Sequence, residues 1–356
     1  MLTANKNVPA APPWSQPADS MWQKPGSWLR RFKPHLQVVR FILGQVLPLL
    51  IVTRRRPVIF SRYMALGDVI CAFPAAHELK KRHPGAAFVF HCREDYACLP
   101  RMGGVTSHTI SELDIRRVKT FFSFLFAGIY TFTYSDEAKN SASTESVIEE
   151  YCRQHGVPVT ATHPRLQIAP EILAKARRIC ENARLGQSRP LIAIHPGPSG
   201  PFREWNPESW TGLVQALKAA GCTQIVQLGA SRSDDVGAAL RATIPEVVSL
   251  INQLSLEESI AVISLCDALI GIDSGLLHIA ASVGTPFVGI FGSTSPQLRF
   301  ASAITRFCVV SRVSCQGCHH RVPRLHWVTG CPFDFDCMKT IQVADVLHAC
   351  QASLAK

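Results

Sequence analysis

Three features common in other protein classes are missing from this 356-residue sequence. The turn after its first expected strand is not G-x-G-x-x-G, so the fingerprint of a nicotinamide-dependent oxidoreductase is absent there. The first thirty residues contain no apolar run typical of a secretory signal, which favours a reducing, cytoplasmic location. Arginines and aromatic residues are not interleaved through the body of the chain, so nucleic acid is not an expected partner.

Charged residues are also scarce, at 18% of the chain against 47% apolar residues, a balance typical of a globular protein with a large core. The formal net charge of +11 is unevenly distributed, because residues 1–57 hold nine lysines and arginines and a single acid, Asp19. We therefore expect a basic N-terminal arm, residues 1–56, that is distinct from the body of the protein.

The arm contains a short apolar segment, Phe41–Val52, between basic clusters at Arg30–Lys33 and Arg54–Arg56. This segment is too short for a spanning helix, which needs about 20 residues. A short apolar helix between basic clusters can lie in a membrane interface, so residues 30–56 are expected to contact the inner face of the plasma membrane. The alternative is a helix that packs on the body of the protein or on a second subunit.

The stretch Cys266–Ser295 holds most of the residues that indicate a function. Two apolar runs, Ala268–Ile272 and Pro286–Phe291, have the length of buried parallel strands, and a helix ending in the small-residue run Ile279–Val283 separates them. This strand–helix–strand unit is typical of a doubly wound α/β sheet, which binds ligands at the carboxyl ends of its strands.

The turn after the first of these strands reads DSGLLH, residues 273–278. Asp273 and Ser274 are predicted to cap the helix, and Gly275 to leave room for a group that approaches the backbone. The free amides at the helix start attract anions, so a phosphate is the expected ligand. His278 is expected to face the same crevice, with a purely structural, hydrogen-bonded histidine as the alternative.

Two more loops follow expected strands at the same edge of the sheet. One loop contains Gly292, Ser293 and Thr294, directly after the second apolar run. The other is a glycine- and proline-rich segment, residues 196–207, that follows a strand at Pro190–His195. Both loops are expected to offer backbone amides to a ligand.

The first half of the body shows the same alternation, with a strand at Pro57–Tyr63 and a helix at Val69–Arg82. The turn between them contains Asp68, which follows a glycine at the carboxyl end of the strand. A carboxylate at this place either caps the helix or acts as a general base toward an attacking hydroxyl. The apolar run at residues 121–128 is expected to be core, with contact to a lipid-bearing acceptor as the alternative.

The remaining pattern alternates in the same way. Further strands are expected at Ala86–Cys92, Gly128–Tyr134 and Thr223–Leu228, and further helices at Glu171–Leu185, Asn206–Ala220, Leu256–Leu265 and Val343–Ala355. The sequence thus predicts an α/β protein with two Rossmann-like domains, residues 57–170 and 171–356.

Three separated motifs resemble those of glycosyltransferase family 9, the ADP-heptose:lipopolysaccharide heptosyltransferases. They are MALGDV at residues 64–69, HPG with a basic residue before Trp-x-Pro at residues 195–207, and DSGLLH through GSTS at residues 273–295. The resemblance implies the GT-B fold, in which two Rossmann-like domains with parallel sheets face each other across a cleft. It also implies an inverting glycosyltransferase, with an acceptor domain first and a nucleotide-sugar donor domain second.

The same resemblance assigns roles to residues of this chain. Asp68 is the expected catalytic base, and the expected donor-binding residues are Arg203, Asp273, Ser274, Gly275, His278, Gly292, Ser293 and Thr294. Arg203 stands where relatives have a lysine that contacts the donor phosphates, with an ordinary solvated arginine as the alternative. Residues 231–235 depart from the family pattern, in which a glutamate meets the nucleoside.

The resemblance further implies the partners of the protein. The expected donor is ADP-heptose, and the expected acceptor is a lipid-linked glycan of the lipopolysaccharide core. Catalysis is expected to need no cofactor.

A cysteine cluster lies near the end of the chain, where Cys315-x2-Cys318-x12-Cys331-x5-Cys337 contains four of the thirteen cysteines. Two pairs of thiolates on tight loops can supply the four corners of a structural zinc site. Neighbouring histidines are alternative ligands: His319, His320 and His326. Some protein-modifying relatives in the resembled family bind iron in a similar loop. Free thiols remain an alternative, as do disulfides, which a reducing compartment disfavours.

Two other functions fit parts of this pattern. Another GT-B-like nucleotide-sugar enzyme, such as an epimerase or a protein heptosyltransferase, would share the fold. A non-catalytic, metal-binding interaction protein would keep the four cysteines and would not need Asp68.

Overall fold

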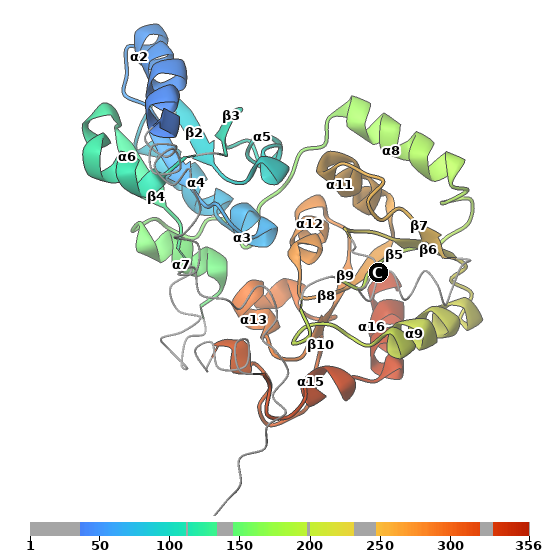
Figure 1. Cartoon of the computed structure of the whole chain (residues 1–356). Coiled ribbons are helices and arrows are strands. Elements are labelled where there is room, and N and C mark those ends of the chain that lie inside the picture. The colour runs from blue at the N-terminus through green and yellow to red at the C-terminus, as the bar shows by residue number, and fades with distance from the viewer. Residues whose placement is uncertain are drawn as a thin grey trace, which may run out of the picture.

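The computed structural model describes residues 36–111, 113–133, 145–197, 200–230, 247–320 and 330–355. The chain forms two α/β halves that lie side by side, each built around a parallel sheet (Figure 1). The first half ends with Gln154, and the second begins with Pro170. The expected features at Arg30–Lys33, residues 231–235 and His326 lie outside the described residues.

The first sheet has the strand order β3-β2-β1-β4, and its strands run parallel. The strands are β1 (Val58–Ser61), β2 (Phe88–His91), β3 (His108–Ile110) and β4 (Gly128–Thr131). β1 is entirely buried in the middle of the sheet, as its apolar run predicts. The sequence missed β3, because an edge strand of three half-exposed residues leaves no apolar run.

The helices of the first half cover this sheet. They are α3 (Leu66–Cys71), α4 (Phe73–Lys81), α5 (Leu99–Met102), α6 (Ile115–Phe121) and α7 (Val147–Gln154), with short 3-10 turns η3 (Glu94–Tyr96) and η4 (Ser123–Leu125). The single helix predicted at Val69–Arg82 is two helices that meet at Ala72. Pro74 lies in the first turn of α4, where its missing N–H costs no helical hydrogen bond.

The second sheet has six parallel strands in the order β10-β9-β8-β5-β6-β7. They are β5 (Leu191–His195), β6 (Gln224–Gln227), β7 (Val248–Ser249), β8 (Ala268–Ile272), β9 (Phe287–Phe291) and β10 (Val309–Val310). The chain builds outward from β5 to β7, then returns to the other side of β5 with β8. This reversal creates a switch point between β5 and β8, where doubly wound sheets bind ligands.

The helices of the second half match the sequence predictions within a few residues. They are α8 (Pro170–Asn182), α9 (Pro207–Ala219), α11 (Leu256–Leu265), α12 (Gly275–Val283), α13 (Pro296–Arg299), α15 (Asp336–Lys339) and α16 (Val343–Leu354), with 3-10 turns η6 (Ser302–Ile304) and η7 (Cys318–His320). α11 begins where predicted because Ser255 and Glu258 form a capping box. The short α13 and α15 were not predicted.

An N-terminal helix, Leu36–Thr53, precedes the first sheet; its middle turn is η2 (Ile42–Val46) and its end is α2 (Leu47–Thr53). With 18 residues and a mean hydropathy of 1.9, it is longer than the predicted segment and meets the length and composition needed to cross a membrane. One face is nevertheless packed, because Val38, Phe41 and Val46 are buried in a cluster with residues of β1, β2 and α6.

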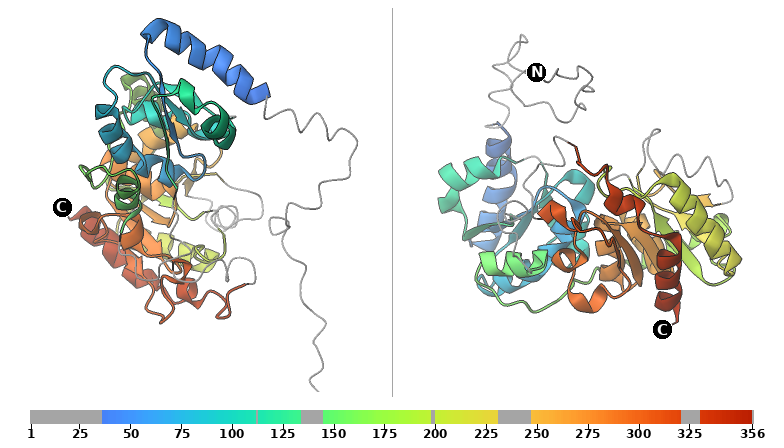
Figure 2. Two further views of the ribbon diagram at one scale, coloured as in Figure 1. Left: turned by 90° about the vertical axis from the view of Figure 1, so that its left-hand side faces the viewer. Right: turned by 90° about the horizontal axis from the view of Figure 1, so that it is seen from below.

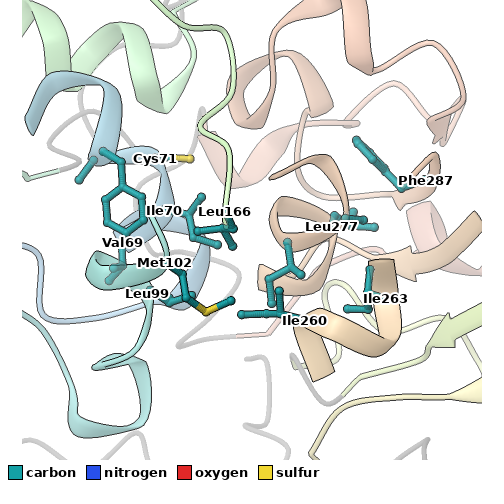
Figure 3. Packing of buried hydrophobic residues seen from close by; sticks show 14 of the residues in the cluster. Val69, Ile70, Cys71, Leu99, Met102, Leu166, Ile260, Ile263, Leu277 and Phe287 are labelled. Atoms are coloured by element: carbon teal, nitrogen blue, oxygen red, sulfur yellow. The ribbon is translucent and has the colours of Figure 1, made fainter. Parts of the chain in front are cut away.

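One apolar core connects the two halves. Ile70 and Met102 of the first half pack in the same cluster as Ile260 and Leu277 of the second, and Leu166 of the connecting segment lies between them (Figure 3). α3 therefore packs directly on α12. This contact brings the loops after β1 and β8 to the same part of the molecule.

Candidate functional site

The two motifs singled out in the sequence meet where α3 packs on α12, and a glycine in each makes the contact close. A Cβ atom on Gly67 would lie 2.5 Å from Cδ2 of His278, and a Cβ atom on Gly275 would lie 2.6 Å from Cδ2 of Leu66. The space that Gly275 was predicted to leave is therefore filled by a side chain of the other half. Both glycines serve the contact between the halves.

Asp68 lies in the first turn of α3 and forms an ion pair with Arg62, which follows β1. Both side chains are less than a fifth exposed, and Arg62 also donates from Nη1 to the carbonyl oxygen of Phe132 at 3.3 Å. No side chain caps α3 among the described residues, so the alternative role of Asp68 as a helix cap is not seen. The carboxylate is oriented by a residue that sequence reasoning missed.

His278 lies on α12, where this helix packs on α3. Its Nδ1 atom lies 3.4 Å from Sγ of Cys71, one turn after Asp68, and its ring stacks on Phe300 at a centroid distance of 4.3 Å. Burial, aided by the neighbouring His163, lowers the pKa of His278 to about 3. Burial likewise raises the pKa of Cys71, and the charge of Asp68 adds to that shift. His278 is thus a neutral residue packed between the halves.

Asp273 follows β8 directly and is buried beside two arginines. Its Oδ2 atom lies 3.7 Å from Nε of Arg203 and 3.5 Å from Nε of Arg299, and Arg203 donates to its backbone oxygen at 3.4 Å. Burial alone would raise the pKa of this carboxyl, but the two arginine charges and the Thr294 hydroxyl outweigh it and hold the pKa well below the usual range. The predicted phosphate-contacting Arg203 is thus held at the switch point by an ionised carboxylate.

The prediction that Asp273 and Ser274 cap α12 is wrong. Ser274 occupies the N-cap position, but no side chain accepts a hydrogen bond from the first turn. The reason is that the Asp273 carboxylate turns toward Arg203 and Arg299 instead. An uncapped helix start keeps its first-turn amides and its positive dipole end available to an anion.

The loop after β9 is fixed by its neighbours. The Ser293 hydroxyl donates to the carbonyl oxygen of Phe202 at 2.6 Å, and Gln316 donates from Nε2 to the Thr294 carbonyl at 2.8 Å. A Cβ atom on Gly292 would lie 2.4 Å from Sδ of Met338. Ser293 and Thr294 are both buried. Because Gln316 and Met338 belong to the segment that contains the four cysteines, this segment holds the loop in place.

Cys315, Cys318, Cys331 and Cys337 line one small cavity of 10 Å³ next to Phe202. All thirteen cysteines are free thiols, which contradicts the disulfide alternative. Burial, with a further contribution from the neighbouring thiols, raises the pKa of Cys337 to about 12 and also raises that of Cys318.

The geometry of these sulfurs does not itself form a metal site. Within the described ranges, no three His, Cys, Asp or Glu side chains are arranged so that they could hold a metal ion. The expected structural zinc or iron therefore stays a prediction.

A larger cavity of 500 Å³ lies at the switch point of the first sheet, between the carboxyl ends of β1 and β4. Arg62, Arg116 and Lys119 are among its lining residues, which include no acidic side chain. Because Arg62 is also the partner of Asp68, the cavity adjoins the predicted base. No sequence pattern identified Arg116 and Lys119, which lie on the unpredicted α6.

Arg299 is the other functional candidate that sequence reasoning missed. It is buried at the end of α13, five residues after Thr294. Its position shortly after the predicted phosphate loop could have marked Arg299 as a candidate phosphate ligand. The sequence alone does not show that it pairs with Asp273.

A sequence profile of glycosyltransferase family 9 (heptosyltransferase) matches residues 128–328, more than half of the chain. Lipooligosaccharide heptosyltransferase 2 of Haemophilus influenzae is 33% identical over 142 residues, which cover 38% of this chain and 40% of that protein. Lipopolysaccharide heptosyltransferase 2 of Salmonella typhimurium is 28% identical over 147 residues, which cover 40% and 41%. The matched part thus spans about two fifths of the length of these curated relatives.

Two solved structures share the fold. The ADP-heptose LPS heptosyltransferase II of Escherichia coli superposes with a TM-score of 0.61 at 18% identity, covering 84% of this chain and 98% of that one. The iron-containing dodecameric glycosyltransferase TibC of enterotoxigenic E. coli H10407 gives 0.62 at 17% identity, with coverages of 84% and 76%. The predicted GT-B fold, with its two parallel-sheet domains, is confirmed.

Proposed function

Since this chain belongs to glycosyltransferase family 9, we propose that it transfers heptose from ADP-heptose to a lipid-linked lipopolysaccharide-core glycan. The observation that carries the proposal is the direct packing of α3, which contains Asp68, on α12, which follows Asp273. The curated relatives are named as heptosyltransferases, and TibC has been solved in complex with ADP-D-beta-D-heptose. These names support the choice of donor.

On the donor side, the proposal depends on positive groups around the switch point of the second sheet. Arg203 and Arg299 outnumber Asp273, so the cluster has a net positive charge that suits a diphosphate. The uncapped start of α12 adds amides and the positive end of its dipole. Together these groups would stabilise the negative charge that develops on the departing ADP.

On the acceptor side, the basic cavity beside Arg62 suits a glycan with phosphate or carboxylate groups. In the proposed step, Asp68 takes the proton of an acceptor hydroxyl while that oxygen bonds to the anomeric carbon of the donor. The bond between this carbon and the phosphate oxygen breaks, and ADP leaves with its electron pair. Attack from the face opposite ADP inverts the configuration at the anomeric carbon.

The test is the Asp68→Asn variant, which keeps the size of the side chain but removes its basicity. We expect kcat to fall by about a hundredfold to ten-thousandfold, the range typical of a lost general base. Thermal stabilisation by ADP should be retained, because Asp68 lies on the acceptor side. The measurement is release of ADP together with the mass gain of the acceptor.

The matched control is Asp95→Asn, which removes an exposed carboxylate of the same half that pairs with Arg93. This variant should transfer heptose at the wild-type rate. Wild-type turnover by Asp68→Asn would rule out the proposed base, and lack of transfer by the wild-type chain would rule out the proposed function.

A further inference from the structure

The N-terminal helix leaves one apolar face uncovered. Five apolar side chains at spacings of three to four residues are exposed along it, and we call them the apolar stripe: Leu36, Val39, Leu43, Leu47 and Ile51. Leu43 is 60% exposed and Ile51 is 75% exposed. When one face of a helix is packed and the opposite face is apolar and exposed, the exposed face is a candidate surface for binding a partner or a membrane.

The packed face fixes the helix along the outside of the first half. Phe41 stacks on Phe126 with ring centroids 6.3 Å apart, and Val38 and Val46 are buried in the same cluster. A helix held in this way can lie flat on a membrane with its stripe in the lipid, whereas spanning the bilayer would require it to leave this cluster. Figure 2 shows the helix, in blue, at the outer side of the first half, with the second half away from it.

The stripe continues onto the neighbouring elements. α6 and η4 pack in the same cluster as the helix, and α6 lies beside it in Figures 1 and 2. Their Phe121 and Phe124 side chains are 64% and 66% exposed, and Arg56 donates to the carbonyl oxygen of Phe124 at 3.2 Å. The run at residues 121–128 is therefore only partly core, since Phe126 is buried while two of its phenylalanines face outward.

The charge around this apolar surface is mostly positive, and the acidic Asp114 at the start of α6 is paired with Arg117. Residues 36–67 include no aspartate or glutamate, and they include the exposed Arg40 and Arg54–Arg56. Arg116 and Lys119 of α6 are also exposed. Basic side chains around an apolar surface complement a lipid surface with anionic headgroups, whereas two copies of this surface would repel each other.

We propose that the apolar stripe, with Phe121 and Phe124, inserts into the headgroup boundary of an anionic lipid membrane. The surrounding arginines and Lys119 bind the anionic headgroups. Arg116 and Lys119 lie on α6 with Phe121 and also line the basic cavity. If the proposed function holds, a glycan on a lipid anchor would reach that cavity while its anchor stays in the bilayer; the docking itself does not depend on catalysis.

The experiment is co-sedimentation of the full chain with vesicles, without donor or acceptor. Wild-type protein should bind vesicles of phosphatidylcholine mixed with phosphatidylglycerol, bind weakly to phosphatidylcholine alone, and release as salt is raised. The double variant Leu43→Glu with Ile51→Glu should need at least about tenfold more lipid for half binding, since it loses two inserted apolar side chains. A second pair, Phe121→Gln with Phe124→Gln, should weaken binding in the same direction.

The matched control is Gln45→Glu with Gln187→Glu, which makes the same charge change at exposed positions outside the stripe. It should bind like the wild type. Equal binding by the stripe variants and the control, or no binding by the wild type, would overturn the proposal. So would light scattering that shows a dimer in the wild type, a monomer in the stripe variant and no vesicle binding, because the surface would then be a subunit interface.

Discussion

Asp273 is buried next to two arginines, so its charge is needed to balance theirs. We predict that Asp273→Asn lowers the free energy of unfolding by about 3–5 kcal/mol, because the buried Arg299 loses the carboxylate with which it pairs. Urea denaturation measures the loss. Thermal stabilisation by ADP should change as well, since Arg203 loses the same partner.

A matched control for this change is Asp334→Asn, which breaks an exposed ion pair with Lys339. Exposed pairs contribute about 0–1 kcal/mol, so the control should stay close to the wild type. A loss no larger for Asp273→Asn than for Asp334→Asn would contradict a structural role of the buried cluster.

Gly67 has a role that no side chain can replace, because the His278 ring occupies the place of a Cβ atom. We predict that Gly67→Ala destabilises the protein by about 1–3 kcal/mol, the usual cost of overpacking, and lowers transfer activity by displacing α3. The comparison is Gly44→Ala, whose Cβ would meet nothing within 4 Å and which should stabilise its helix by up to about 1 kcal/mol. Thermal melting and the transfer assay measure both effects, and equal stability of the two variants would refute the packing argument.

The cysteine loop contacts the loop after β9 directly. His319 donates its backbone N–H to the Ser293 carbonyl at 2.9 Å, its ring stacks on Phe202, and Cys337 packs beside Gly292. Anything that orders the four sulfurs therefore also orders the predicted phosphate loop. This connection gives the loop a positioning role whether or not it binds a metal.

The predicted structural metal has a direct test. If the four sulfurs close around a metal ion, protein purified without chelators contains about one zinc or iron atom per chain. Cys318→Ser then removes most of it, because a tetrahedral site needs all four ligands. Elemental analysis by mass spectrometry measures the content. Cys98→Ser, at a partly buried cysteine outside the loop, is the control. A metal-free wild type would leave the four sulfurs as the free thiols of the alternative interpretation.

Elements with a strong local signal were predictable, and contacts between distant elements were not. β8 and α11 have the predicted bounds because an apolar run and a capping box define them locally. The break at Ala72 and the helix α6 lack such signals.

The residues of the candidate site also fall into those that a local motif identifies and those that only the three-dimensional structure reveals. The sequence identified Asp68, Arg203 and Asp273 through their motifs, but it missed Arg62 and Arg299, whose importance comes from pairing in three dimensions. The predicted helix cap failed for the same reason, because a tertiary ion pair competed with a local hydrogen bond.

The contact between the halves should weaken in acid. Burial lowers the pKa of His163, in the connecting segment, to about 4 and that of His278 to about 3. Below pH 6.5 the unfolded chain therefore binds protons that the folded chain does not, so stability falls as the pH drops from 6.5 toward 4. We predict a loss of about 1–2 kcal/mol per buried histidine at pH 5 relative to pH 7.

Urea denaturation at both pH values measures this loss, and two variants isolate it. His163→Gln should reduce the difference between pH 7 and pH 5, whereas His348→Gln, at an exposed position, should leave it unchanged. His91 and His195 are also buried and titrate in the same direction, so the comparison between variants matters more than the total. An unchanged difference in His163→Gln would contradict the prediction.

The apolar core shared by the two halves restricts how substrates enter and leave. Separating the halves would expose Ile70, Leu166 and Leu277 to water, at a cost of about 25 cal/mol for each Å² of apolar surface (Figure 3). Donor and product should therefore exchange through movements of the loops after β8 and β9, while the apolar core between the halves stays packed. The turnover rate would then depend on how fast these short loops move. Mutations that loosen the packing between the halves would expose apolar surface and lower the solubility of the protein.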